Sequence, residues 1–192
     1  MKKEILEWIV SIAVALIIVG IVVKFIGVTY SVSGDSMYPT FKDREKVVVS
    51  KISKTLDHID NGDIVVFKED KDRDFIKRLI GKPGDKVESK GDQLYVNNKK
   101  IDEPYLKYNK EHKNGKYLTG SFKSSDLQNA NGETKIPKDK YLVLGDNRQN
   151  SLDSRFPQVG LIDKEQIVGK VVLRFWPFGE WTTKFNPGTF DK

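Results

Sequence analysis

The stretch FIKRLI at residues 75–80 decides how the chain is expected to fold. Successive side chains of a β-strand point to opposite faces, so Phe75, Lys77 and Leu79 share one face. The other face is apolar as well, apart from Arg78. Because both faces are apolar, the pattern predicts that Lys77 lies among Phe75 and Leu79 rather than in water. The alternative is an edge strand from which the lysine extends to solvent.

Burial would change the acid–base chemistry of Lys77, because a nonpolar setting disfavours the ammonium form. A lysine with an ordinary pKa of about 10.4 is neutral in roughly one molecule in 2,500 at pH 7. A pKa of about 8 would raise the neutral fraction to about a tenth, at a cost of roughly 3 kcal/mol in folding stability. A buried Lys77 is therefore a candidate general base.

Short apolar runs bounded by turn residues surround this stretch on both sides. They lie at residues 46–50, 63–67, 94–101, 141–144 and 167–175. The run at 94–101 contains the pair Asn97-Asn98, which predicts the turn of a hairpin. Runs this short and frequent predict a mostly antiparallel β domain.

Residues 102–137 differ from these runs, because they are rich in Lys, Asn, Asp and Gly and poor in branched aliphatic residues. We interpret them as a surface insertion with a weak core of its own, and we expect residues 86–137 to form one inserted polar subdomain. It divides the β domain into residues 29–85 and residues 138–192, and the second part ends in an aromatic tail. In that tail we expect Trp176 and Phe178 to close the core, with insertion into a membrane interface as the alternative.

The first 28 residues predict a membrane anchor. Sixteen residues without a charge run from Trp8 to Val23, and a helix over residues 8–28 would be about 31 Å long, close to the apolar thickness of a bilayer. A cleaved signal peptide, with its cleavage site near residues 31–33, and a buried soluble helix are the alternatives. Lysines on both sides of the segment leave its orientation undecided.

Composition excludes several classes of site. The 192 residues contain no cysteine, which rules out a disulfide scaffold, a thiolate metal site and a cysteine nucleophile. The two histidines, His58 and His112, are too few for a histidine-rich metal site, and we expect both to be exposed. The net charge of +6 arises from bases interleaved with acids, so we expect no nucleic-acid partner. We expect no metal and no other cofactor.

Two further segments carry groups suited to catalysis. The sequence SGDSMYPT at residues 33–40 places Ser36 between a glycine and a proline, in a turn that could surround its hydroxyl with backbone N–H groups. A serine nucleophile needs a base, and with histidine scarce a lysine or a carboxylate must serve. The sequence GDNRQNSLDSR at residues 145–155 follows an apolar run and is dense in acids, arginines and serines. Plain polar turns are the alternative for both segments.

Taken together, these segments resemble type I signal peptidase, the membrane-anchored serine peptidase that removes signal peptides from exported proteins. The anchor and the segments at residues 33–40, 62–67, 77–85 and 145–155 follow the order of that family. The last block has the pattern GDNRxxSxDSR, which is the most specific of them. The short anchor and small insertion are most similar to the Gram-positive bacterial form.

The resemblance implies a mostly β fold with an antiparallel β catalytic domain, a small inserted subdomain and one N-terminal transmembrane helix. It implies that Ser36 is the nucleophile, that Lys77 is the general base, and that the hydroxyl of Ser151 orients the lysine. It also implies two supporting ion pairs, Arg78 with Asp146 and Asp153 with Arg155.

The resemblance further implies cleavage after a small-x-small (Ala-x-Ala) site in exported preproteins. The shallow apolar substrate pockets would be lined by Tyr30, Val32, Met37, Phe75 and Ile76. Gly34 stands where some relatives have a serine that helps form the oxyanion hole, so the second oxyanion donor stays unidentified. The protein would be a single-pass protein of the cell membrane, in contact with the lipid bilayer, with a cytoplasmic N-terminus and an extracytoplasmic catalytic domain, and we expect a monomer.

Two other protein classes fit the sequence less well. The self-cleaving repressors of the DNA-damage response share Ser/Lys chemistry, but they need a DNA-binding module and an internal Ala-Gly site, and no Ala-Gly dipeptide occurs here. An inactive, membrane-tethered binding protein would be expected to lack the serine or the lysine, and both are present.

Overall fold

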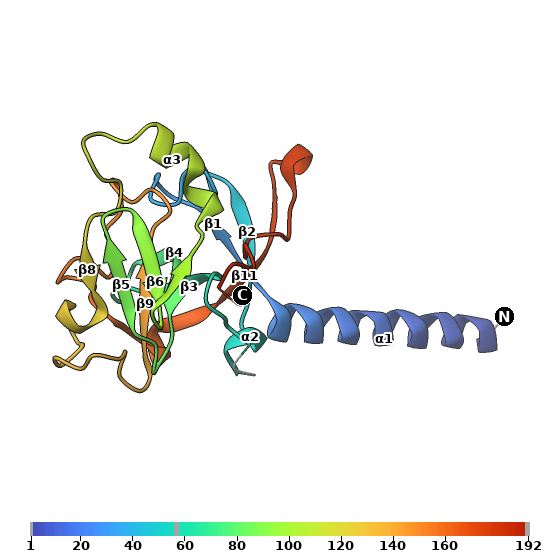
Figure 1. The fold of residues 1–192 in the computed structure, drawn as a ribbon. Helices are drawn as coiled ribbons and strands as arrows, with labels where there is room; N and C mark the ends of the chain where they lie inside the picture. The colour runs from blue at the N-terminus through green and yellow to red at the C-terminus, as the bar shows by residue number, and fades with distance from the viewer. Residues whose placement is uncertain (1, 56–57, 191–192) are drawn as a thin grey trace.

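A long N-terminal helix projects from a β domain in the computed structural model, which describes residues 2–55 and 58–190 (Figure 1). The helix α1 covers Lys2–Ile26, and the chain enters strand β1 at Val28. The helical prediction for this segment is confirmed, although it ends two residues early. Among the residues that the structure describes, no helix meets both the length and the apolarity that crossing a bilayer requires. The prediction of a transmembrane segment is therefore not confirmed by the structure.

The main sheet has seven antiparallel strands in the order β1-β2-β11-β3-β4-β9-β10. Their bounds are β1 Val28–Ser31, β2 Lys46–Ser50, β3 Ile64–Lys68, β4 Asp74–Gly81, β9 Lys140–Leu144, β10 Ile162–Asp163 and β11 Ile167–Trp176. The mostly antiparallel β prediction is thus confirmed.

The stretch at residues 75–80 lies in β4, an interior strand that pairs with β3 on one side and β9 on the other. In the register with β3, Lys77 lies opposite Val65 and Arg78 lies opposite Ile64. The side chain of Lys77 is almost completely buried, with only 3% of its surface exposed. The edge-strand alternative is therefore excluded, because neighbours on both sides keep solvent away from the strand.

A second sheet of four antiparallel strands, in the order β7-β6-β5-β8, forms within residues 86–137. Its strands are β5 Val87–Lys90, β6 Gln93–Val96, β7 Lys99–Ile101 and β8 Phe122–Lys123. The predicted hairpin joins β6 to β7, and both Asn97 and Asn98 have positive φ angles, of 51° and 65°, as a type I′ turn requires.

The inserted subdomain does not have the separate, weak core that its composition suggested. Its buried side chains, such as Val87, Leu94 and Ile136, form one cluster with Leu142 and Leu144 of the main sheet. The error arose because composition counts the many exposed polar residues, whereas a few apolar residues on the inner face are sufficient to dock a small sheet. The subdomain is thus packed onto the strand that precedes the loop at residues 145–155.

Short helical segments and the C-terminal tail complete the fold. They are α2 Ile52–Thr55, η1 Pro104–Leu106, α3 Lys107–Glu111, η2 Ser124–Asp126, η3 Lys164–Gln166 and η4 Phe178–Glu180. In the tail, Trp176 and Phe178 are 43% and 74% exposed, so the prediction that they close the core is wrong. Phe185 and Phe190, further along the tail, pack against the core clusters instead.

Candidate active site

Ser36 lies in a tight turn between β1 and β2. The turn begins at Gly34, whose φ of +77° lies in the region that favours glycine and whose N–H donates to a carboxylate oxygen of Asp43 at 2.8 Å. It is closed by the N–H of Tyr38, which donates to the carbonyl of Asp35 at 3.0 Å. The hydroxyl of Ser36 consequently lies at the rim of the domain, at partial exposure, while the next residue points into the core.

The ammonium nitrogen of Lys77 lies directly beside this serine. Its Nζ donates to Ser36 Oγ at 2.9 Å and to the carbonyl of Ile76 at 3.1 Å. The same nitrogen lies 4.9 Å from the centre of the Phe75 ring. Residues 41 positions apart in the sequence are thus within hydrogen-bonding distance, which is the geometry that proton transfer between them needs.

Burial lowers the pKa of Lys77 from 10.5 to about 8. The cause is loss of hydration, which penalises the ammonium form, and it outweighs the opposing attraction of the Asp153 and Asp146 carboxylates. Lys77 has no salt bridge among those formed by the described residues. At neutral pH an appreciable fraction of this amine therefore carries no proton and can act as a base.

The loop at residues 145–155 packs against the Ser36 turn. The N–H of Asn147 donates to the carbonyl of Ser36 at 3.0 Å, and its side-chain amide donates to the carbonyl of Asp35 at 3.0 Å. A Cβ atom added to Gly145 would lie 2.5 Å from the Ser36 carbonyl oxygen and would clash with Ser151 Oγ. Glycine is therefore required there for the loop and the turn to approach each other.

Ser151 is buried in this loop, but it does not make the hydrogen bond to Lys77 that the resemblance implied. Within the described part of the chain, Ser151 Oγ has no hydrogen-bond partner. A buried hydroxyl without a partner is costly, and such groups are found where a mechanism or a ligand uses them. It lies beside Gly145, which packs against the Ser36 carbonyl.

Two arginine–carboxylate pairs support the site. Arg78, completely buried on β4, donates from Nε and Nη2 to the two oxygens of Asp146 at 2.9 and 2.7 Å. Arg155 pairs with Asp153 in the same bidentate way, at 2.8 and 2.9 Å, and Asp153 also accepts the N–H of Gly145 at 3.0 Å. The Arg78 pair thus ties the start of the loop to β4, and the bonds of Asp153 join the two ends of the loop to each other.

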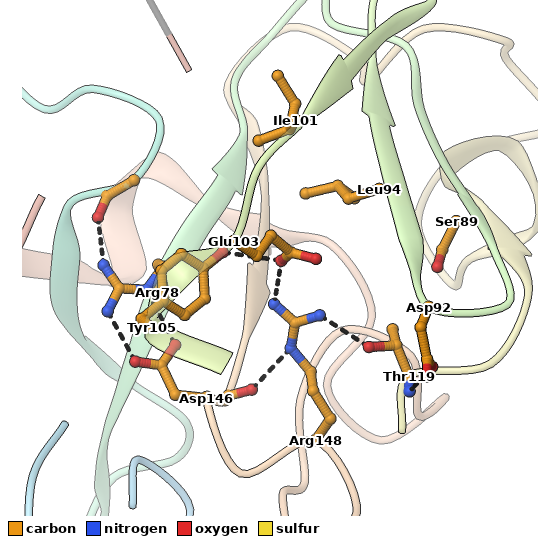
Figure 2. Close-up of polar contacts among 12 residues, drawn as sticks. Arg78, Ser89, Asp92, Leu94, Ile101, Glu103, Tyr105, Thr119, Asp146 and Arg148 are labelled. Carbon is orange, nitrogen blue, oxygen red and sulfur yellow. Dashed lines mark hydrogen bonds and ion pairs between the residues drawn. The ribbon is translucent and has the colours of Figure 1, made fainter. Parts of the chain in front are cut away.

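Beyond the expected pair, Arg78 belongs to a larger buried network (Figure 2). Its guanidinium stacks on the ring of Tyr105 at 3.9 Å, and the Tyr105 hydroxyl donates to Glu103 at 2.8 Å. Glu103 in turn accepts from Arg148, whose side chain is fully buried. Sequence reasoning missed Glu103 and Tyr105, because they lie in the segment interpreted as polar surface.

A groove of about 470 Å³ opens beside Ser36 and Lys77. Four of the five expected substrate-pocket residues line it, namely Tyr30, Val32, Phe75 and Ile76. The prediction for Met37 is wrong: the groove lining does not include it, and it is 1% exposed within a core cluster. The turn directs Ser36 outward and therefore directs the adjacent side chain inward. The groove is also lined by residues that sequence reasoning did not single out, among them Val47, Val66, Asp74, Asn150 and Leu152.

Tyr30 and Asp74 close one part of the groove with a hydrogen bond. The Tyr30 hydroxyl donates to Asp74 at 2.8 Å, and burial together with this bond raises the pKa of Tyr30 to about 12. Both side chains belong to strands of the main sheet, so the bond joins β1 to the start of β4.

The histidines and acids of the described residues form no competing site. His58 and His112 are exposed, as expected. In the described ranges no group of three or more His, Cys, Asp or Glu side chains is arranged to hold a metal.

Comparison with known proteins gives a consistent family. Residues 5–176 match the family model described as signal peptidase, peptidase S26. The chain is 58% identical over 188 residues to signal peptidase IB of Staphylococcus aureus (strain COL), covering 97% of both chains. It is 46% identical over 182 residues to signal peptidase I S of Bacillus subtilis (strain 168), covering 93% of both.

A solved structure agrees with these sequence relatives. The crystal structure of a signal peptidase I from Enterococcus faecalis V583 superposes with a TM-score of 0.52 at 32% identity, covering 58% of this chain and 95% of the other. Fold and sequence thus point to the same group of enzymes. The chain therefore belongs to the signal peptidase family, peptidase S26, and is a serine endopeptidase of the Gram-positive signal peptidase I type.

Proposed function

We propose that this protein removes signal peptides from exported preproteins, with Ser36 as the nucleophile and Lys77 as the general base. The observation that carries the proposal is the 2.9 Å contact between Lys77 Nζ and Ser36 Oγ, made by a lysine whose pKa burial lowers to about 8. A serine and a base within hydrogen-bonding distance are the minimum that nucleophilic acyl transfer requires.

The reaction proceeds in two halves. Neutral Lys77 accepts the proton of the Ser36 hydroxyl, and Oγ attacks the scissile carbonyl carbon to form a tetrahedral oxyanion, which backbone N–H groups of the Ser36 turn stabilise. Collapse breaks the C–N bond, and the Lys77 ammonium gives its proton to the leaving amine. A water molecule, deprotonated by Lys77, then attacks the acyl-enzyme, which releases the signal peptide and restores Ser36.

Ser151 and the two arginine–carboxylate pairs support this reaction by positioning the reacting groups. We infer that Ser151, whose buried hydroxyl has no partner among the described residues, accepts a hydrogen bond from Lys77 when the amine moves during proton transfer. Arg78 with Asp146 and Arg155 with Asp153 hold the loop that carries Ser151. We assign these five residues positioning roles.

The groove accounts for selection of small residues before the cut. Its walls near the dyad are formed by Val32, Ile76 and Val66, which leave room for short apolar side chains in an extended peptide. An extended substrate can also add main-chain hydrogen bonds along a strand edge. We infer cleavage after a small-x-small site, typically Ala-x-Ala, and the apolar lining of the groove supports this inference.

We further propose that α1 anchors a monomeric enzyme at the cell membrane, with a cytoplasmic N-terminus and an extracytoplasmic catalytic domain. The support is the exposure of its apolar side chains, such as Trp8 at 72% and Leu16 at 66%, which need a nonpolar environment. Ser36 lies eight residues beyond the start of β1, so the anchor would hold the site near the bilayer surface.

The first prediction concerns the dyad. Ser36→Ala should abolish cleavage of a preprotein in detergent, and Lys77→Ala should lower kcat/KM by about 10²- to 10⁴-fold, the usual contribution of a general base. The exposed Lys71→Ala serves as the control and should cleave like the wild type. Thermal unfolding would verify that all variants are folded. Retained activity in folded Lys77→Ala would remove the lysine from the mechanism.

The second prediction concerns pH. Because only neutral Lys77 is a base and its pKa is about 8, kcat/KM should rise with pH and level off above about pH 9. The neutral fraction grows from about a tenth at pH 7 to about nine tenths at pH 9, so the rate should increase roughly tenfold. A profile that stays flat from pH 6 to pH 9 would contradict this assignment.

The third prediction concerns stability. The pKa of Lys77 is lower in the folded chain than in the unfolded chain, so the cost of burying the amine is fully present below about pH 8 and disappears as the pH approaches 10.5. Lys77→Met should therefore raise the free energy of unfolding by about 1–3 kcal/mol at pH 7, and the gain should vanish near pH 11. Urea unfolding of both proteins at pH 7 and at pH 11 measures this difference in the free energy of unfolding. A gain that does not depend on pH would show that it does not come from the burial of a charged amine.

The fourth prediction concerns the anchor. The full chain should float with lipid vesicles in a density gradient, whereas a chain lacking residues 2–26 should float far less. Equal flotation of the two chains would show that α1 is not the membrane-binding element.

A further inference from the structure

Three side chains of the inserted subdomain make polar contacts with the loop at residues 145–155, which carries Ser151. Glu103 accepts from Arg148 Nη2, and Thr119 Oγ1 accepts from Arg148 Nη1 at 3.0 Å (Figure 2). The third is Asn109 of α3. Residues outside the two parts of the catalytic domain thus contact the loop repeatedly.

Asn109 joins this loop to the Ser36 turn. Its side-chain amide donates one N–H to the carbonyl of Tyr38 at 2.7 Å and the other to the carbonyl of Asp146 at 2.9 Å. Asn109 is only 8% exposed, and its bond to the Asp146 carbonyl is buried, where loss of the donor would leave that carbonyl without a partner. A single amide group has two N–H donors, and both of them are used.

The bridge lies next to the direct contacts between the same two segments. Asn147 donates to the carbonyls of Asp35 and Ser36, which belong to the peptide groups before and after Ser36. The ring of Tyr38 also packs edge-on against Tyr108, the neighbour of Asn109, at 5.4 Å between ring centres. The turn is therefore held to the loop on one side and to α3 on the other.

Glu103 acts on the same end of this loop, through Arg148. Its carboxylate, 5% exposed, accepts from Arg148 and from Tyr105, and Arg148 Nε donates to the carbonyl of Gly145 at 3.0 Å. Gly145 is the residue packed against both Ser151 Oγ and the Ser36 carbonyl. A displacement of Arg148 would consequently reach the close contact at Gly145.

We propose that the inserted subdomain positions the catalytic dyad, with Asn109 holding the Ser36 turn against the loop at residues 145–151 and Glu103 holding the start of that loop. The proposal rests on the proposed function of Ser36 and Lys77. Asn109 is a positioning residue, because it touches neither reacting atom. Its effect follows from the steep dependence of acyl transfer on geometry, where a displacement of about 1 Å can cost about 10²-fold in rate.

The competing explanation is that Asn109 only fills space between α3 and the turn. Asn109→Asp separates the two explanations, because aspartate has nearly the same volume but presents a carboxylate to two carbonyl oxygens. If Asn109 fills space, Asn109→Asp should be milder than Asn109→Ala. If the two N–H donors matter, Asn109→Asp should be the more damaging change.

The test measures kcat and KM for cleavage of a preprotein by the full chain in detergent. We expect both Asn109 variants to lower kcat by about 10- to 100-fold with KM changed by less than about threefold, and Asn109→Asp to be the slower. The matched control is Asn129→Asp, since Asn129 is also an amide of the inserted subdomain that donates to a carbonyl of the catalytic domain, Leu161, but away from the dyad. The control should keep wild-type kcat.

A second readout does not depend on activity. Amide hydrogen exchange at Asn147, whose N–H donates to the Ser36 carbonyl, should become at least about tenfold faster in both Asn109 variants. Exchange at Leu79 in β4, whose N–H donates to Asp63, should not change. A purely structural role would accelerate both amides together.

These measurements distinguish failure of the proposed function from failure of the positioning proposal. If the wild type cleaves no preprotein, the proposed function fails, and the positioning proposal is judged on exchange at Asn147 alone. Unchanged exchange at Asn147, an Asn109→Asp variant as active as Asn109→Ala, or loss of cooperative unfolding in both variants would each overturn the proposal.

Discussion

The removal of one amine from water is the constraint on which the site depends. Lys77 lies on an interior strand with β3 and β9 on either side, and it makes hydrogen bonds to Ser36 and to a backbone carbonyl but no salt bridge among the described residues. Loss of hydration therefore exceeds the attraction of the nearest carboxylates and lowers its pKa. A chain optimised only for stability would place an apolar side chain at position 77. The same burial that costs folding stability there lowers the pKa of the amine and so provides the neutral base that the proposed reaction uses.

Arg78, the next residue on β4, has the opposite protonation outcome. Arg78 is even more deeply buried, yet it stays charged, because Asp146 meets it in a bidentate geometry and the carbonyls of Gly62 and Phe185 accept from Nη1. Burial alone thus does not decide protonation. The two neighbouring cations differ because one has a carboxylate in contact and the other does not.

The sequence was informative where local periodicity determines the environment, and uninformative where distant segments meet. Apolar residues on both faces of residues 75–80 predicted the burial of Lys77, since alternation is a property of the strand itself. Met37 was misplaced because side-chain direction in a turn depends on backbone angles that periodicity does not encode. Asn109 and Glu103 were missed because their partners in the loop at residues 145–155 lie at least 37 positions away, and only the docking of the second sheet on β9 brings them together.

The pairing of charges around Lys77 follows from the same constraint. An unpaired carboxylate near the amine would stabilise the ammonium form and return the pKa toward its ordinary value, as Asp153 and Asp146 already do in part. Each buried carboxylate in this region has its own arginine: Asp146 has Arg78, Asp153 has Arg155, and Glu103 has Arg148. Because each pair is neutral as a whole, its field at Lys77 falls off faster with distance than that of a single charge. The arginines paired with these acids therefore limit how far the acids raise the pKa of Lys77. Unpaired acids in a loop of the same shape would raise that pKa further, and Lys77 could not serve as the same base.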